Sequence, residues 1–282
     1  MSKLHIGAQL DRAPGRKYTA ALRFAEFAPR APLPRPGTLA SMRSGLPDEF
    51  VFALRAPRSS IVSARGALRM DAELEAGISW LVSAADALSA RAVVFNTPAD
   101  LTPGARSREL LRDYVARLPR SLERHYVWLP QGVWEPEDAA ALCAELGLVY
   151  GFDPLETRAP ASALTYATLR ALGHRSGFSS AALSDALVAI LSHRPSEAFL
   201  SVDAERAFDI ARRLTTLLAE ATAAADDVEP ETPGRAPESD DEDESAEDED
   251  SDEDDEYDED DADHEDDEDA SDEPGAGKRE SD

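Results

Sequence analysis

Residues 48–59 read DEFVFALRAPRS, a run of apolar residues that ends in two arginines on either side of a proline. Phe50 to Leu54 have the composition of a β-strand buried on both faces, as in the parallel sheets of α/β proteins. Arg55 and Arg58 follow at the point where such a strand should reach the surface. The stretch therefore predicts a buried parallel strand with two arginines at or after its carboxyl end.

Similar apolar runs recur along the chain up to residue 225. The strand candidates are residues 4–10, 22–28, 50–56, 92–97, 125–130, 148–153, 164–169 and 198–203. Apolar residues at helical spacing predict helices over residues 71–90, 105–119, 135–147, 179–192 and 203–225. Strands that alternate with helices predict a parallel α/β fold, either a closed (β/α)₈ barrel of the TIM type or an open doubly wound sheet.

The closed barrel is favoured over the open sheet for two reasons. Eight repeats fit roughly the usual barrel length, and no G-x-G-x-x-G follows the first strand, where HIGAQLDRAPG stands instead. Residues 29–47 leave room for one short helix at most. We therefore expect an irregular barrel whose irregular side lies at residues 29–47.

The acidic residues are concentrated at the carboxyl end of the chain. Residues 226–282 hold 33 Asp and Glu against 3 Lys and Arg, which leaves 24 acidic and 26 basic residues in 1–225. The formal net charge of −28 is therefore a property of this tail. Because the tail lacks an aliphatic pattern and its charges repel one another, it is predicted to be disordered. We expect a barrel domain over residues 1–225 and a disordered acidic tail over 226–282.

Several classes of site have no motif in the sequence. Cys143 is the only cysteine, and none of the five histidines forms an H-x-x-x-H or H-E-x-x-H pattern, so neither a metal nor another cofactor is expected. The sequence has no G-x-S-x-G and no P-loop, so hydrolase and nucleotide-triphosphatase functions have no motif support. The absence of a signal-peptide pattern and of an 18-residue apolar run predicts a cytoplasmic protein with no membrane partner.

Four stretches resemble a known family. Residues 45–61, GLPDEFVFALRAPRSSI, resemble a landmark of the YecE-like family, domain of unknown function 72, whose members are TIM-type barrels. Residues 3–10, KLHIGAQL, resemble its opening strand, and residues 24–43 match a segment in which Glu26 corresponds to a family glutamate. Residues 198–214, AFLSVDAERAFDIARRL, resemble its closing strand and helix. The resemblance runs in order over roughly residues 3–218 and implies a TIM-type barrel.

The sequence departs from the family at several predicted strand ends. The family's Gly-Thr-Ser-Gly-Trp is replaced by residues 7–11, GAQLD, and of its Glu-x-Arg-His-x-Ser-Trp only Trp134 remains. Arg170 is kept without the family's following histidine, and Asp203 is kept without the paired asparagines. Because these strand ends line one mouth of a barrel, where sites are built, the chain resembles a divergent member of the family.

The candidate ligand-binding residues lie at or just after predicted strand ends: Glu26, Arg55, Arg58, Trp134, Asp153, Arg170 and Asp203. The three arginines could form one anion or phosphate site, or be ordinary solvated strand ends. Glu26 and Asp153 could form an acid–base pair, although a salt bridge between Glu26 and one of the arginines is the simpler interpretation. Trp134 could rim the mouth. Arg55 is expected to reach the mouth, where its truncation to alanine should change stability by roughly 1 kcal/mol or less.

Two functions remain open. The first is a non-catalytic barrel that binds an anionic or other small ligand at its mouth, with a tail that solubilises the chain or binds a basic protein. The second is an enzyme acting on a phosphorylated or oxygen-rich small molecule through Glu26, Arg55, Arg170 and Asp203. No nucleic-acid partner is expected. Because residues 1–60 hold ten basic and four acidic residues, the tail is also expected to associate transiently with this basic side at low salt.

Overall fold

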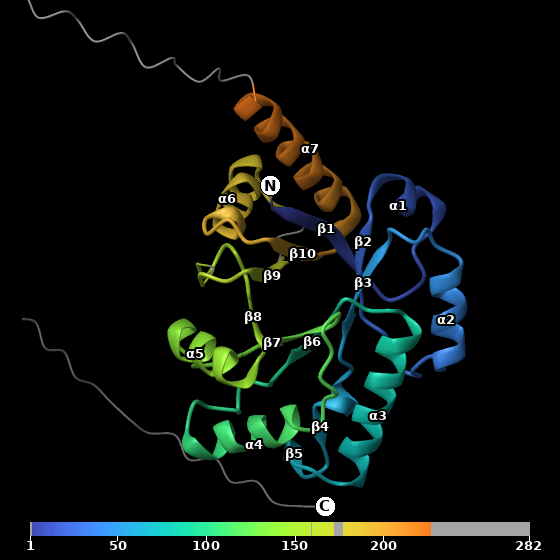
Figure 1. The fold of residues 1–282 in the computed structure, drawn as a ribbon, viewed down its shortest axis with the longest axis vertical. Coiled ribbons are helices and arrows are strands. Elements are labelled where there is room, and N and C mark those ends of the chain that lie inside the picture. Colours follow the sequence, from blue (N-terminus) through green and yellow to red (C-terminus); the bar gives the residue numbers. More distant parts are fainter. Residues whose placement is uncertain (1, 159, 172–176, 227–282) are drawn as a thin grey trace, which may run out of the picture. The chain divides into compact units, whose positions relative to one another are not determined.

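Eight parallel strands close into one barrel in the computed structural model, which describes residues 2–158, 160–171 and 177–226 (Figure 1). Around the barrel the strands follow the order β1 (Lys3–Leu10), β10 (Glu197–Asp203), β9 (Leu164–Arg170), β8 (Val149–Phe152), β7 (His125–Leu129), β6 (Ala92–Asn96), β3 (Val51–Arg55) and β2 (Phe24–Phe27). All neighbouring strands are parallel, and the β1–β10 pair closes the ring. The predicted (β/α)₈ barrel is confirmed, with each strand within two residues of its predicted position.

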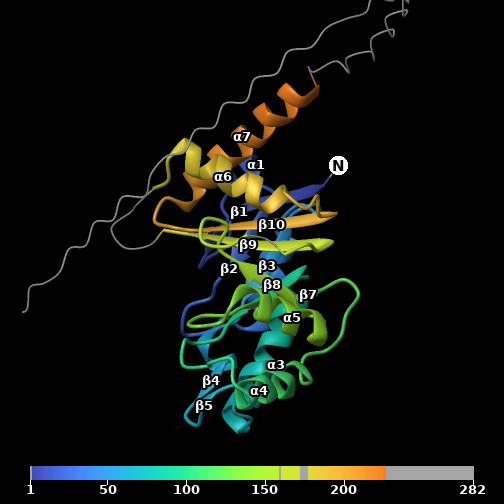
Figure 2. The ribbon, with the colours of Figure 1, turned by 90° about the vertical axis from the view of Figure 1, so that its left-hand side faces the viewer.

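Helices lie around the outside of the strands (Figures 1 and 2). They are α1 (Arg16–Ala21), α2 (Pro36–Ser44), α3 (Ala72–Ala87), α4 (Ala105–Val115), α5 (Pro136–Leu146), α6 (Ser180–Leu191) and α7 (Ala207–Asp226). Between β3 and α3 the chain forms the short 3₁₀ helix η1 (Arg58–Ser60) and a hairpin of β4 (Val62–Ser63) and β5 (Gly66–Ala67). The five predicted helices are confirmed, whereas α1 and the hairpin were not anticipated from the sequence.

Local sequence signals explain where several helices begin and end. The Asp71 carboxylate accepts a hydrogen bond from the backbone N–H of Leu74 and caps α3, and the Ser179 hydroxyl caps α6 in the same way through Ala182. Pro136 occupies the first position of α5, where its missing N–H has no helical partner to lose. The same helix ends at Gly147, whose φ of +70° is a left-handed conformation that favours glycine.

The barrel departs from regular alternation of strand and helix at the connection between β8 and β9. Residues 29–47 accommodate the nine-residue α2, which begins at Pro36 and buries Leu39. The described part of the connection between β8 and β9, residues 153–163, contains turns but no helix, and in Figure 1 a loop lies between α5 and α6. Residues 29–47 thus hold one short helix, as the sequence predicted, and the connection with no described helix is the one between β8 and β9.

Alternation along each strand divides the core into two clusters. Phe52 and Leu54 belong to the cluster beneath the helices, and Phe50 joins them there; all three are at most 2% exposed. Ala53 lies between them in sequence but belongs to the second cluster, which fills the barrel interior together with residues such as Phe24, Val94, Val127, Tyr166 and Phe199. The apolar run at 50–54 is thus continuous because its strand is buried on both faces, as predicted.

The amino-terminal end of the barrel interior holds a buried histidine. The Nε2 atom of His5 lies 3.2 Å from Oε1 of Glu197, and Arg91 donates a hydrogen bond of 3.3 Å to the other oxygen of that carboxylate. The His5 ring stacks on Phe199 with 4.8 Å between the ring centroids. Burial and the charge of Lys3 together lower the pKa of His5, and they outweigh the opposing effect of Glu197.

We expect His5 to make the fold less stable below neutral pH. Because its folded pKa lies below its unfolded value of about 6.5, the native state binds fewer protons than the unfolded chain just below that pH. The free energy of unfolding should therefore fall as the pH drops below about 6.5. Urea unfolding at pH 7.5 and 5.5 should show a smaller loss for His5→Gln than for the wild type. An equal loss in both proteins would exclude His5 as a source of this dependence.

The predictions of a disordered acidic tail and of no membrane-spanning segment can be compared with the described residues only. Residues 227–282, which contain nearly the whole predicted acidic tail, lie outside them, and Asp226 is the last residue of α7. Among the residues that the structure does describe, no helix combines the length and the apolar character needed to cross a membrane.

Candidate functional site

Polar side chains replace apolar ones on the inner face of the barrel at the carboxyl ends of its strands. On β2, β3 and β6 the inner apolar residues Phe24, Ala53 and Val94 are each followed two positions later by a polar residue, on the same face of the strand. The same alternation continues along β9 and β10. We call the resulting set the polar layer; it comprises Gln9, Glu26, Arg55, Asn96, Tyr166, Thr168, Ser201 and Asp203.

A buried ion pair forms the centre of the polar layer. The Glu26 side chain has no exposed surface, and the Arg55 side chain is 14% exposed. Arg55 donates from Nε to Oε1 of Glu26 over 2.6 Å and from Nη1 to the side-chain oxygen of Asn96. Gln9 donates to the same glutamate oxygen over 3.0 Å, and the Tyr166 hydroxyl donates to Oε2 over 2.5 Å. Side chains from three other strands, β1, β3 and β9, thus hold the Glu26 carboxylate of β2 in a fixed position.

The ion pair keeps Glu26 charged although it is buried. Burial by itself would raise the pKa of the Glu26 carboxyl, but the charge of Arg55 and the hydrogen bonds from Arg55, Tyr166 and Gln9 hold this pKa below its ordinary value. Burial and the negative charge of Glu26 raise the pKa of Tyr166 well above its ordinary value. Glu26 is therefore an acceptor and Tyr166 a donor in this arrangement.

Asp203 lies at the rim of the polar layer with the opposite shift. It is half-buried at the end of β10, beside Arg170 in the β9–β10 register. Burial raises the pKa of the Asp203 carboxyl and Glu26 raises it further, against the opposing charges of Arg55 and Arg170. The pKa values of the two carboxyl groups in the layer are thus shifted in opposite directions, downward for Glu26 and upward for Asp203. This arrangement suits Glu26 to stay charged and Asp203 to carry a proton.

Three atoms of the polar layer are buried without a hydrogen-bond partner: Nη2 of Arg55 and the hydroxyl oxygens of Thr168 and Ser201. Thr168 and Ser201 are paired in the β9–β10 register, so their side chains leave adjacent strands at the same level. Across the described residues only five side-chain atoms are buried in this way, and the other two belong to Tyr114 and Tyr126. Unsatisfied buried polar groups are costly, so their concentration in one layer calls for an explanation.

The structure brings together four of the predicted site residues, Glu26, Arg55 and Asp203 in the polar layer and Arg170 beside Asp203. The salt-bridge interpretation of Glu26 is confirmed. The acid–base pair of Glu26 with Asp153 is not formed, because both oxygens of Asp153 accept backbone hydrogen bonds, from Leu155 over 3.0 Å and from Arg170 over 3.1 Å. Asp153 therefore stabilises the turn after β8, and the second carboxyl of the layer is Asp203.

The three arginines do not form one site. Arg55 lies inside the barrel, whereas residues 56 and 57 carry the chain away from β3, and Arg58 begins η1 as an exposed residue. Arg170 is half-buried at the end of β9, beside Asp203. In the described part of the chain, no hydrogen bond or ion pair joins Arg58 to the polar layer. The predicted cluster of arginines is thus reduced to Arg55 with Arg170 nearby.

Trp134 has a packing role that the sequence did not predict. Its side chain is 8% exposed, and its indole N–H donates to the carbonyl of Leu101 over 2.6 Å. Its ring meets Trp128 edge to face, with centroids 4.9 Å apart, and Arg108 lies over it. The ring is therefore used inside the protein and does not offer an open stacking surface at the mouth.

Sequence reasoning missed the uncharged members of the polar layer, namely Gln9, Asn96, Tyr166, Thr168 and Ser201. A signal for them was present, since each lies two or four positions from another inward-facing residue of its own strand. Counting in steps of two along each predicted strand would have found them once the inner face was assigned. Their burial and their lack of partners could be seen only in the folded chain.

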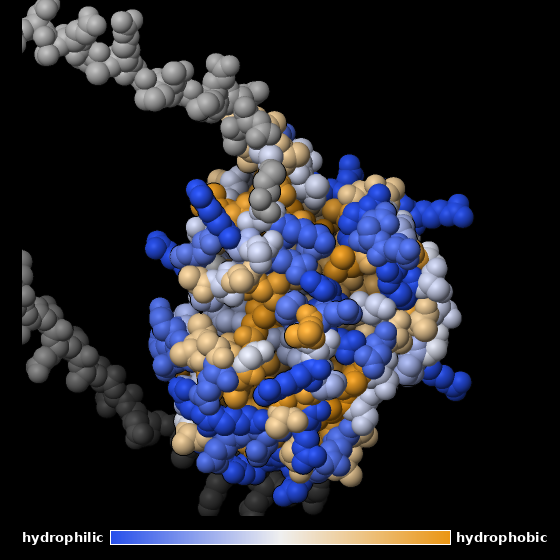
Figure 3. Space-filling view, viewed as in Figure 1, coloured by the Kyte–Doolittle hydropathy of each residue, from blue (hydrophilic) through white to orange (hydrophobic). Residues whose placement is uncertain are grey.

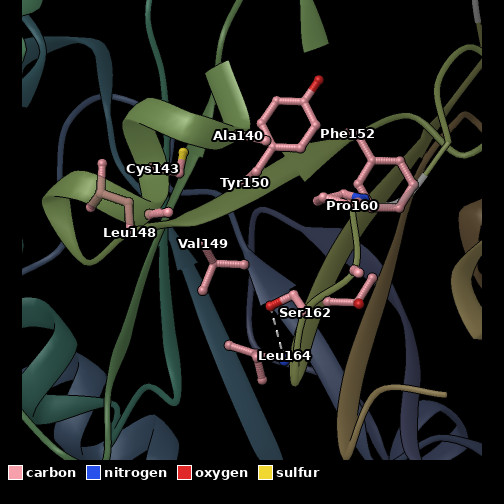
Figure 4. Close-up of a pocket in the computed structure, with 12 residues that line it drawn as sticks. Ala140, Cys143, Leu148, Val149, Tyr150, Phe152, Pro160, Ser162 and Leu164 are labelled. Carbon is pink, nitrogen blue, oxygen red and sulfur yellow. Dashed lines mark hydrogen bonds between the residues drawn. The ribbon is translucent and has the colours of Figure 1, made fainter. Parts of the chain in front are cut away.

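Neither of two hollows found among the described residues is lined by the polar layer. One of about 150 Å³ lies on the outside of the barrel, where α5 and the β8–β9 connection leave Tyr150, Phe152 and Cys143 around it (Figure 4). None of its lining residues is charged, and apolar side chains reach the surface between α5 and α6 (Figure 3).

Within residues 2–158, 160–171 and 177–226 no group of three or more His, Cys, Asp or Glu side chains is placed to hold a metal ion.

Comparison with known proteins gives likeness in structure alone. No family model matches the sequence, and no curated protein matches it. A DUF72 family protein from Enterococcus faecalis V583 superposes with a TM-score of 0.57 at 11% identity, over 78% of this chain and 98% of that one. A DUF72 family protein from Thermotoga maritima MSB8 gives 0.55 at 13%, over 77% and 99%.

A third solved structure, SacUVDE, gives a TM-score of 0.53 at 9% identity, over 79% of this chain and 99% of that one. Such low identities establish a common fold and nothing further. The likeness nevertheless agrees with the resemblance of residues 45–61 to the same family. The chain therefore has the barrel fold of the DUF72 family proteins.

Proposed function

We propose that this chain is a divergent DUF72-type barrel whose mouth binds a small, oxygen-rich molecule through the polar layer. One observation carries the proposal: among the residues that the structure describes, Nη2 of Arg55 and the hydroxyls of Thr168 and Ser201 are buried without partners in the same layer. Leaving a buried polar group unpaired costs about 1–3 kcal/mol. Polar atoms kept at that cost beside a fixed ion pair are best accounted for by a ligand that supplies the missing hydrogen bonds.

Removal of the two hydroxyls should stabilise the protein without ligand. In the double variant Thr168→Val with Ser201→Ala, two unpaired buried hydroxyls give way to apolar groups of similar shape, and the free energy of unfolding should rise by about 1–3 kcal/mol. Chemical unfolding of the wild type and the variant, followed by tryptophan fluorescence, measures the difference.

Thr97→Val is the matched control. The Thr97 hydroxyl is also buried, but it accepts a hydrogen bond of 2.9 Å from Nε1 of Trp128. Its removal leaves the indole N–H unpaired and should lower stability by about 1–3 kcal/mol. If the double variant loses stability as Thr97→Val does, then Thr168 and Ser201 have structural partners and the proposal loses its basis.

A second candidate function is an enzyme that uses the same layer for acid–base chemistry. The observation that favours it is the opposite pKa shift of the two carboxyl groups, downward for Glu26 and upward for Asp203. Such a division suits a reaction in which Asp203 passes a proton to or from a bound oxygen while Glu26 stays charged. The enzyme and the binding protein share the ligand site and differ only in whether turnover follows binding.

A further inference from the structure

The two most deeply buried charges of the polar layer, Glu26 and Arg55, neutralise each other. Glu26 is paired with Arg55 through a 2.6 Å hydrogen bond, and Asp203 lies beside Arg170 in the β9–β10 register. A fully charged anion in the layer would therefore meet no arginine that lacks an acidic neighbour. It would also be placed beside Glu26, which is buried and held in its charged form. Like charges at short range inside a protein repel strongly, because little water screens them.

The unpaired atoms offer neutral hydrogen bonds. Each of the hydroxyls of Thr168 and Ser201 can donate one hydrogen bond and accept others, and Nη2 of Arg55 can only donate. Because Thr168 and Ser201 are paired on neighbouring strands, their backbones lie about one strand spacing apart, about 4.7–4.9 Å, and their side chains leave on the same face of the sheet.

From this balance of charge and this spacing we infer that the ligand is an uncharged polyhydroxylated molecule, such as a sugar, a polyol or a cyclitol. Adjacent ligand hydroxyls bond to Thr168 and Ser201, and a third ligand oxygen accepts from Nη2 of Arg55. Asp203, half-buried at the rim, accepts from or donates to a further hydroxyl. This inference rests on the proposed function and narrows the class of its ligand.

The experiment compares neutral and anionic probes on the full chain. Xylitol, D-glucose and myo-inositol form the neutral set, and inorganic phosphate and sulfate form the anionic set. Binding of each is measured by ligand-observed NMR and by the shift of the unfolding temperature. The same titrations are run on Thr168→Val with Ser201→Ala and on a surface control, Thr216→Val with Ser44→Ala, whose hydroxyls are exposed.

At least one neutral probe should bind the wild type and the surface control. It should bind the layer variant about tenfold or more weakly, since two hydrogen bonds to the ligand are lost. Neither oxyanion should show binding that depends on Thr168 and Ser201. Binding of phosphate or sulfate that is lost in the layer variant, with no polyol binding, would overturn the inference and leave the proposed function standing. Failure of every probe to bind would also overturn it, and the unfolding measurement on the layer variant then decides the proposed function separately.

Discussion

Replacement of Arg55 by methionine should lower the free energy of unfolding by about 3–5 kcal/mol, the range typical of a buried ion pair that loses one partner. Glu26 would remain fully buried with only Tyr166 and Gln9 as hydrogen-bond donors. The sequence alone led us to expect a change of roughly 1 kcal/mol or less, because Arg55 stood at a strand end, where side chains are usually exposed. The structure corrects that expectation. Urea unfolding of the variant measures the loss.

A double variant separates the charge from the packing. Combining Arg55→Met with Glu26→Gln leaves no charge buried and keeps an acceptor for the Tyr166 hydroxyl, so most of the lost stability should return. Arg112→Met serves as the control, since its pair with Glu145 is exposed and its loss should leave stability unchanged. If Arg55→Met is as stable as the wild type, Glu26 must be uncharged in the folded protein, and the account of the polar layer given above is wrong.

Truncation of Phe52 to alanine should cost about 3–5 kcal/mol, as is typical for a buried phenylalanine. The Phe52 side chain is 1% exposed, belongs to the core beneath the helices and meets Phe50 edge to face at 5.1 Å. The loss combines the transfer of its ring to water with the cavity left behind. The measurement is again the free energy of unfolding, with Val133→Ala as the control, because Val133 is 68% exposed and should change stability by no more than about 0.5 kcal/mol. A loss of that small size for Phe52→Ala would mean that the barrel wall rearranges to fill the space.

The sequence predicted the barrel well because the buried residues of its strands and helices recur in recognisable patterns along the chain. Strands covered on both faces appear as short apolar runs, such as residues 50–54 and 92–95, and the helices between them repeat at three and four positions. The helix α1 escaped notice because it has only six residues and buries only Tyr18. Residues 29–47 were expected to hold one short helix at most, and they hold the nine-residue α2, which has Pro36 in its first turn, where proline is tolerated.

The candidate site was predicted only where it carries charge. Glu26, Arg55 and Asp203 stood out as charged residues at strand ends, and all three belong to the layer. Thr168 and Ser201 did not, because a small hydroxyl residue inside an apolar strand is compatible with ordinary β-structure. Whether such a hydroxyl has a partner depends on side chains from strands far away in the sequence.

The closure of the ring by β1 and β10 has a consequence for how the chain is made. His5 and Glu197, which meet across this pair, are separated by 192 positions. A ribosome that adds roughly 5–20 residues per second would place about ten to forty seconds between the appearance of the two strands. Throughout that interval β1 has one free edge, and exposed strand edges pair readily with other chains. Any sheet that forms before β10 emerges is therefore open at β1, and a chaperone that shields this edge would act in that interval.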